Sequence, residues 1–198
     1  SDYVGELLNM GRGRAEAEGF DINFKVADAE NLPFDDGSFT GVVSTFGVMF
    51  TPNQEQSASE LLRVCKSGGR IGLANWTPDG FIGQLFKTLG RLVPPPAGVQ
   101  SPARWGTQEW LQENFGNEAS NISITPKTFK LRFESPMAFI DLFRTYYGPV
   151  HKAFLALEPA GQDELTQDML ALIERFNIAD DGSAIIASDY LEVIIEKK

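Results

Sequence analysis

The fold class follows from residues 39–75, FTGVVSTFGVMFTPNQEQSASELLRVCKSGGRIGLAN. Residues 39–43 are nearly all apolar, which is typical of a strand buried on both faces of a parallel sheet. Residues 55–64 carry apolar or small side chains at helical spacing and predict an amphipathic helix. A turn at residues 66–69 then leads into a second strand at 70–75. A strand, a helix and a strand in this order predict a right-handed crossover in a parallel sheet, and therefore an α/β fold.

The flanking sequence extends this pattern in both directions. Upstream, residues 3–18 predict a helix, and residues 22–27 alternate apolar and polar side chains, as a strand does. Downstream we expect helices at about 81–92, 136–157 and 161–176, a helix capped by Thr107, and strands at 128–133 and 190–195. We expect a single domain over residues 1–198, with an insertion or lid at about 77–106 and a helical segment on the acceptor side at about 136–176.

Composition excludes several classes of partner. The net charge is -10 and the basic residues are scattered, so a nucleic acid or an anionic membrane surface is not expected to bind. The single cysteine, Cys65, suits a reducing cytoplasm, where we place the protein. One histidine and one cysteine argue against a metal site and against a metal hydrolase. No apolar run is long enough to span a bilayer.

Acidic side chains stand where two predicted strands end. Asp2 precedes the first helix, and Asp28 follows the strand at residues 22–27. Ligands of open α/β sheets bind beyond the carboxyl ends of the strands. One carboxylate there can accept hydrogen bonds from the hydroxyls of a ribose, and the other can accept one from an adenine amine. Asp2 is equally consistent with a helix N-cap, and Asp28 with a turn residue.

The sequence around these acids resembles a known family. Residues 26–34 (VADAENLPF), 36–39 (DGSF), 42–44 (VVS) and 61–70 (LLRVCKSGGR) are similar to class I S-adenosylmethionine-dependent methyltransferases of the ubiquinone/menaquinone-biosynthesis type, also called methyltransferase type 11. The resemblance covers roughly residues 1–116. Ser67 stands where proline is usual, and Thr40 where aspartate is common.

The resemblance implies a Rossmann-like fold, mostly parallel with an antiparallel C-terminal strand, and S-adenosylmethionine as cofactor. Asp2 would bind the ribose hydroxyls, with Tyr3 beside the adenosine. The adenine edge would meet Asp28, Ala29 and Glu30. The implied contacts of the methionine part and its methyl group are Ser44, Thr45 and Phe46.

The family's glycine-rich cofactor loop has no counterpart in residues 1–198. The family orders its strands 3-2-1-4-5-7-6, so the segment at residues 22–27 would lack a neighbour on the side facing the strand at 39–43. We therefore expect that the N-terminal strands belong to a longer protein.

On the acceptor side, methyl transfer from a sulfonium needs alignment and desolvation more than acid–base chemistry. His151 is the candidate general base, with a surface histidine as the alternative. The candidate walls of a pocket for a small, partly apolar acceptor are Trp76, Phe81, Trp105, Phe139, Phe143 and Tyr147, which could equally be plain core.

Two other functions fit parts of the sequence. A catalytically silent methyltransferase-like module for binding or assembly would keep the fold without the chemistry. A nicotinamide-dependent oxidoreductase would need G-x-G-x-x-G opening a helix, a spacing that does not occur in residues 1–198. The acceptor atom stays open, and so does the oligomeric state, for which a homodimer is one candidate.

Overall fold

The computed structural model describes all 198 residues and has an α/β architecture. The elements in chain order are α1 (Gly5–Glu18), β1 (Phe39–Thr45), η1 (Val48–Phe50), α2 (Gln54–Val64), β2 (Cys65–Trp76), α3 (Phe81–Leu92), η2 (Pro102–Gly106), α4 (Gln108–Phe115), β3 (Ala119–Phe133), α5 (Pro136–Tyr146), α6 (Gly148–Ala156), α7 (Pro159–Phe176) and β4 (Ala184–Lys197). The four-stranded sheet has the order β1-β2-β4-β3. β1 and β2 are parallel, and β4 is antiparallel to both of its neighbours. The predicted α/β fold with an antiparallel C-terminal strand is confirmed.

The crossover from β1 through α2 to β2 follows the predicted pattern, with one correction. The side chain of Asn53 caps α2 by accepting a hydrogen bond from the Gln56 N–H, 3.1 Å away. The correction is that β2 already pairs with β1 at Cys65, opposite Phe39; residues 66–69 then leave the ladder, as the predicted turn requires, and regular pairing resumes at Arg70, where the strand was expected to begin. Gly68 has a φ of +74°, and a Cβ on Gly69 would lie 2.9 Å from the Thr40 carbonyl oxygen. The two glycines therefore let an irregular stretch of β2 pass close to β1.

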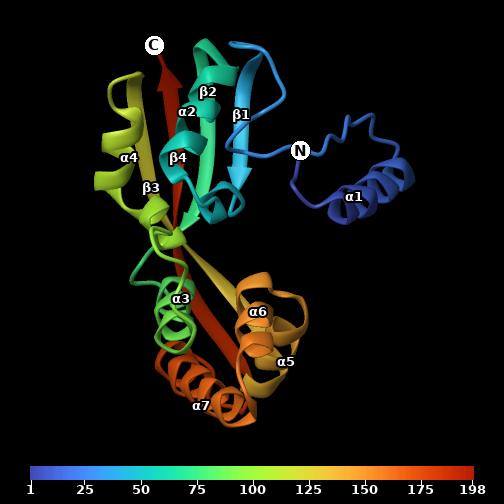
Figure 1. Cartoon of the computed structure of the whole chain (residues 1–198), viewed down its shortest axis with the longest axis vertical. Helices are drawn as coiled ribbons and strands as arrows, with labels where there is room; N and C mark the ends of the chain where they lie inside the picture. The colour runs from blue at the N-terminus through green and yellow to red at the C-terminus, as the bar shows by residue number, and fades with distance from the viewer.

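β3 and β4 are much longer than the sequence pattern predicted. They pair antiparallel from Ala119 opposite Lys197 to Phe133 opposite Ala184. Pro126 lies inside β3, which is tolerated because β3 is an edge strand. Figure 1 shows the β3–β4 ribbon running out of the main sheet, where α2 and α4 lie, toward a second group formed by α3, α5, α6 and α7.

The helix expected at residues 136–157 is two helices. Tyr147 is extended, with φ −89° and ψ 106°, and separates α5 from α6. Pro149 explains the break, because a proline inside a continuous helix would clash with the preceding turn and lack an N–H. Residues 77–106 contain α3 and η2, and the Thr107 side chain caps α4 by accepting from the Trp110 N–H.

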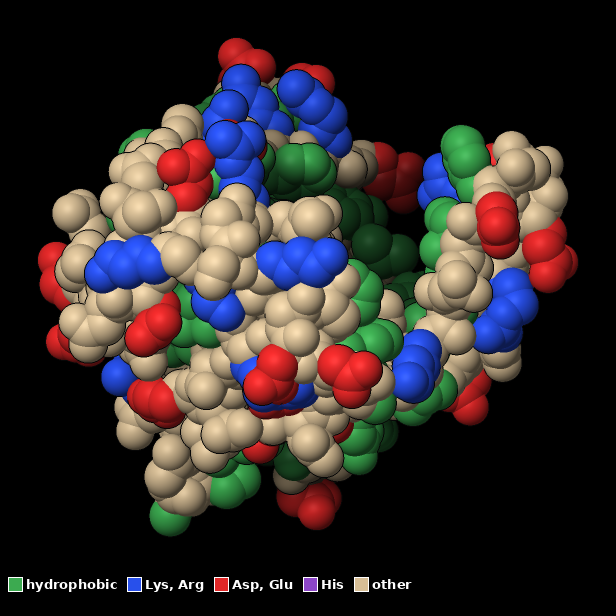
Figure 2. Space-filling view, turned by 90° about the horizontal axis from the view of Figure 1, so that it is seen from above, with side chains coloured by type: hydrophobic (Ala, Val, Ile, Leu, Met, Phe, Trp, Pro, Cys, Tyr) green, Lys and Arg blue, Asp and Glu red, His purple; other side chains and the backbone are tan.

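The N-terminal segment, residues 1–38, differs most from expectation. The strand predicted at 22–27 is reduced to a single parallel bridge between Asp2 and Val26, since no longer run of backbone partners lies beside it. β1 was expected to be buried on both faces, but it is an edge strand and Val43 is 74% exposed. Seen from above, the N-terminal segment stands away from the body of the protein, and hydrophobic side chains line the hollow between them (Figure 2).

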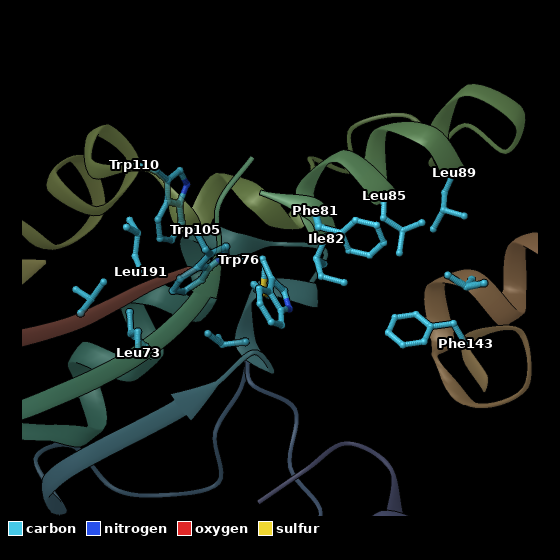
Figure 3. Packing of buried hydrophobic residues seen from close by; sticks show 14 of the residues in the cluster. Leu73, Trp76, Phe81, Ile82, Leu85, Leu89, Trp105, Trp110, Phe143 and Leu191 are labelled. Atoms are coloured by element: carbon cyan, nitrogen blue, oxygen red, sulfur yellow. The ribbon is translucent and has the colours of Figure 1, made fainter. Parts of the chain in front are cut away.

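Most of the interior forms one cluster of 33 buried residues. Figure 3 shows Trp105 and Trp110 close to Leu73 and Leu191 of the sheet, and Phe81, Leu85 and Leu89 along α3. No helix of the chain has both the length and the apolar character needed to cross a membrane.

Candidate functional site

Asp2 and Asp28, the acid pair, lie at the same end of the N-terminal segment. The Ala27 N–H donates to the Asp2 carbonyl at 3.0 Å, and the Asp2 N–H donates to the Lys25 carbonyl at 3.4 Å. This parallel pairing sets Asp2 opposite Val26, and Asp28 follows two residues later. Residues two apart along an extended chain share a face, so the backbone brings the two acids to one edge.

Each acid of the pair uses one carboxylate oxygen locally. Oδ1 of Asp2 accepts from the Val4 N–H at 2.8 Å, and Oδ1 of Asp28 accepts from the Glu30 N–H at 2.9 Å. Both residues are exposed, and Oδ2 of each accepts no hydrogen bond within the chain. The turn-stabilising role is therefore real, and it leaves an oxygen of each acid free for a ligand.

The loop after Asp28 is fastened to α2. Oε1 of Glu30 accepts from the Asn53 N–H at 2.7 Å, and the Glu30 carbonyl accepts from the Gln56 side chain. Ala29 packs against the main cluster of buried residues. Glu30 thus holds the N-terminus of α2, and its carboxylate is engaged by the protein itself.

Two residues that the sequence analysis missed position this loop. Arg63 donates to the carbonyl oxygens of Leu32 and Phe34 and pairs with Glu60 and Asp36. The hydrogen bond from Arg63 lowers the pKa of the buried Glu60 carboxyl, and hydrogen bonds with both acids raise the pKa of the Arg63 guanidinium. Their spacing of three on the helix was visible in the sequence, but the loop carbonyls that Arg63 holds were not.

An aromatic cluster of Phe46, Trp76 and Tyr190 lies where β1 and β2 end. Phe46 has a φ of +58°, the only non-glycine residue in the left-handed region, and its N–H donates to the Ala74 carbonyl at 2.8 Å. Its ring stacks on Trp76 with centroids 4.1 Å apart, and Tyr190 lies edge-on to Phe46 at 5.3 Å. Such a backbone costs of order 1–3 kcal/mol, which this packing offsets.

The remaining predicted cofactor residues surround these two features. Ser44 Oγ accepts from the Val48 N–H at 3.0 Å and shapes the turn after β1. Thr45 is exposed at the carboxyl end of β1, and Tyr3 is 75% exposed beside Asp2. Tyr190 was missed because only the register of β2 and β4 places it opposite Trp76.

A cavity of about 440 Å³, the loop cavity, opens beside η1. Its walls come from η1, α3, the loop at residues 93–102 and α6. The lining is mostly apolar and includes Met49, Phe50, Phe86, Leu89, Gly90, Val93, Pro95, Pro96, Val99, Pro102, Pro149 and Ala153, with Thr51, Gln100, Ser101 and Lys152 as polar members. The insertion and the later helices thus meet around a cavity, as the sequence suggested, but with different residues.

The predicted acceptor residues do not line this cavity. Phe81, Trp105 and Phe139 have no exposed surface and belong to the main cluster of buried residues, which agrees with the alternative of plain core; their contact with an acceptor stays a prediction. Trp76 belongs to the aromatic cluster. Phe143 stacks on Phe139 with centroids 3.9 Å apart and lies tilted against Tyr147 at 4.8 Å, and burial raises the pKa of the Tyr147 hydroxyl. Aromatic residues at helical spacing could not reveal which of them face a cavity.

His151 lies exposed on α6 and is not among the cavity residues. Its Nδ1 is 2.8 Å from the Arg144 carbonyl oxygen at the end of α5, so Nδ1–H donates and Nε2 keeps the basic lone pair. Its role as a general base stays a prediction.

Comparison with known proteins relates the chain to methyltransferases by sequence and by structure. A family model described as a methyltransferase domain matches residues 1–73. An uncharacterized protein of Mycobacterium tuberculosis is 37% identical over 85% of the chain and 62% of its own length. The chain therefore spans less than two thirds of that relative. A second M. tuberculosis protein, also uncharacterized, is 30% identical over 100% of the chain and 72% of its own length.

A relative with a named activity and a solved structure complete the comparison. Demethylmenaquinone methyltransferase of Thermus thermophilus is 30% identical over 68% of the chain and 64% of its own length. The structure of a Bacillus halodurans protein described as a candidate methyltransferase matches with a TM-score of 0.60 and 20% identity, covering 99% of this chain and 80% of that one. This structural likeness concerns the fold.

Proposed function

Because the chain belongs to the class I S-adenosylmethionine-dependent methyltransferases, we propose that it transfers a methyl group from S-adenosylmethionine to a small apolar molecule held in the loop cavity. The family supports methyl transfer in general. The residues that hold the cofactor and the acceptor are our proposal, and so is the small size of the acceptor.

The observation that carries the proposal is the parallel pairing of Asp2 with Val26, which sets the acid pair at one edge. A nucleoside offers hydroxyl and amine donors, and each acid has an Oδ2 that no group of the chain occupies. The residues present therefore fit an adenosine. Asp2 would accept from the ribose hydroxyls and Asp28 from the adenine amine, while Ala29 and Glu30 form the backbone beside it.

The aromatic cluster would contact the sulfonium end of the cofactor, from which the methyl group is transferred. S-Adenosylmethionine supplies, when bound, a sulfonium-activated methyl group that passes to the acceptor by in-line displacement. Aromatic faces attract cations and exclude water, so Phe46 and Trp76 are suited to hold a positively charged centre in a dry environment. Phe46 lies three and four residues before Met49 and Phe50, which line the loop cavity. The turn after β1 thus links the two halves of the proposed site.

Calorimetric titration of the full-length protein with S-adenosylhomocysteine tests this proposal. Asp2→Asn and Asp28→Asn each keep an oxygen for the local turn but remove the charge. Because hydrogen bonds to charged groups contribute about 1.5–3 kcal/mol, we expect the affinity to fall about tenfold or more. Asp21→Asn is the matched control, since Asp21 is an exposed acid of the same segment outside the pair.

The outcomes separate the proposal from its main alternative. Binding by the wild type that weakens in the two acid-pair variants, but not in the control, supports methyl transfer. No binding by the full-length protein would favour the catalytically silent module. If neither Asp2→Asn nor Asp28→Asn changes the affinity, the nucleoside binds at another place in the protein.

A further inference from the structure

We infer that the loop cavity binds an apolar molecule that carries one anionic group, such as an aryl-alkyl carboxylate, and that Lys152 pairs with the anion. This inference rests on the proposed function insofar as the loop cavity is the acceptor site, and it adds the chemical class of the acceptor. It concerns residues that no sequence motif indicated.

The walls of the cavity fit an apolar body. Met49 is fully buried, Leu89 is 7% exposed, and the rings of Phe50 and Phe86 meet edge to face with centroids 5.7 Å apart. The volume of about 440 Å³ lies within the ~300–1,000 Å³ of ordinary small-molecule sites. An acceptor without an apolar part would leave these walls facing water.

Hydrogen bonds from α2 and three prolines hold the loop that forms one wall of the cavity. Gln54 of α2 is 1% exposed, and its Nε2 donates to the carbonyl oxygens of Gln100 and Ser101 at 3.4 and 3.2 Å. Prolines at positions 95, 96 and 102 restrict the same loop. The loop is therefore held against α2, so the cavity is a fixed part of the fold.

The charge at the cavity is a single cation. Lys152 is the only ionisable residue of the lining, and no carboxylate of the chain pairs with it. Of the other cations in this part of the fold, Arg91 pairs with Glu164 and Asp168, and Arg104 with Glu55, whereas Arg144 donates to Gln162 and lies over the Phe154 ring. In a chain of net charge -10, an unpaired ammonium beside an apolar cavity favours an anionic ligand over a neutral or cationic one.

The experiment compares three probes of one shape. The full-length protein, without methyl donor, is titrated with 4-phenylbutyrate, 4-phenylbutanol and 4-phenylbutylamine. We expect the carboxylate to bind about fivefold more tightly than the alcohol, since an ion pair at a solvent-facing rim contributes up to about 1 kcal/mol, and the amine to bind least. Lys152→Met should abolish the preference for the carboxylate and leave the affinity for the alcohol within twofold.

Matched variants complete the test. Lys130→Met is the control for charge, since Lys130 is an exposed lysine of β3 outside the cavity. Gly90→Phe should block both the acid and the alcohol, because a Cβ at Gly90 meets no atom within 4 Å and the added ring can enter the cavity. Gly13→Phe on α1, also with open space around it, is its control.

Two results would overturn the inference: equal binding of acid and alcohol by the wild type, or binding of the acid that Lys152→Met and Gly90→Phe leave unchanged. Because these titrations contain no nucleoside, they fail independently of the S-adenosylhomocysteine experiment. Intact S-adenosylhomocysteine binding without any probe binding would refute this inference and retain the proposed function.

Discussion

The N-terminal segment and the half of the molecule around the loop cavity hold their candidate residues in opposite ways. In residues 1–38, Asp2 and Asp28 are fixed by turns and one backbone bridge, and the segment buries few side chains. Around the loop cavity, the residues come from η1, α3, a loop and α6, and a continuous core supports them. The first arrangement depends on hydrogen bonds, including those that tie the loop after Asp28 to α2, whereas the second exists because distant elements pack their side chains together.

The largest expected effect would break the packed half. Trp105→Ala removes a fully buried ring that packs 4.1 Å from Trp110, so the free energy of unfolding should fall by about 3–5 kcal/mol. Met10→Ala on α1, where the side chain is 73% exposed, should change it by less than about 0.5 kcal/mol. Chemical denaturation of both variants measures the contrast. Equal losses would mean that the N-terminal segment is packed as tightly as the core.

A smaller effect concerns the connection between the two regions. The folded-state pKa of Glu60 is lowered, so its carboxylate stabilises the fold above the ordinary pKa of 4.5, and this stabilisation is lost as pH falls through the lowered value. Glu60→Gln should therefore reduce stability near pH 7 and flatten its decline in acid. Thermal melts from pH 7 to pH 3 test this. A variant whose melting temperature declines in acid as steeply as that of the wild type would contradict the assignment.

A smaller effect is expected at the aromatic cluster, where Phe46 lies in the turn between β1 and η1, the element that lines the loop cavity. Phe46→Leu keeps an apolar side chain but removes the aromatic face. A cation–π contact contributes about 0.5–1 kcal/mol at an accessible site. The variant should therefore lose about two- to fivefold in affinity for S-adenosylmethionine, whose sulfur is cationic, and less for S-adenosylhomocysteine, whose sulfur is neutral. Paired titrations of the two nucleosides measure the difference, and equal losses would remove Phe46 from the cationic end.

The smallest expected effect is that of His151→Ala. His151 is exposed, outside the cavity lining, and its Nδ1 is engaged by the Arg144 carbonyl. Since an activated sulfonium needs no obligatory base, turnover with a given acceptor should change less than twofold between pH 6 and 9. A loss of tenfold or more would establish His151 as the general base.

The sequence predicted the crossover well because its signals are local. The apolar residues at 39–43 and the amphipathic residues at 55–64 gave β1 and α2 nearly at their observed bounds. The prediction of a strand at 22–27 was wrong because the alternation of apolar and polar side chains indicates only which side chains a strand would bury. A strand also needs a backbone partner along its length, and here the pairing is a single bridge. The break at Pro149 was readable from the sequence and was overlooked in favour of the apolar pattern around it.

The residues of the candidate site were likewise predicted where their signals are local in sequence and missed where they depend on distant contacts. The acid pair was found because acidic residues next to strand ends are visible along the chain. Tyr190, Arg63 and Lys152 were missed because their importance depends on what lies opposite them: Trp76 across the sheet, the loop carbonyls, and the apolar walls of the cavity. Phe81 and Trp105 lie in the core and outside the lining of the loop cavity, a distinction that the sequence could not make because an aromatic residue buried in a core and one lining a cavity look alike in sequence.

The α/β class, the parallel crossover and the family could be predicted from the amino-acid sequence alone, since periodicity and short motifs depend on neighbours a few residues apart. The folded structure was needed to show which aromatic rings meet at the strand ends, where a cavity opens and that the unpaired Lys152 lies beside it. Those properties arise from contacts between residues far apart in the chain, and packing, which depends on shape and volume in three dimensions, selects among them.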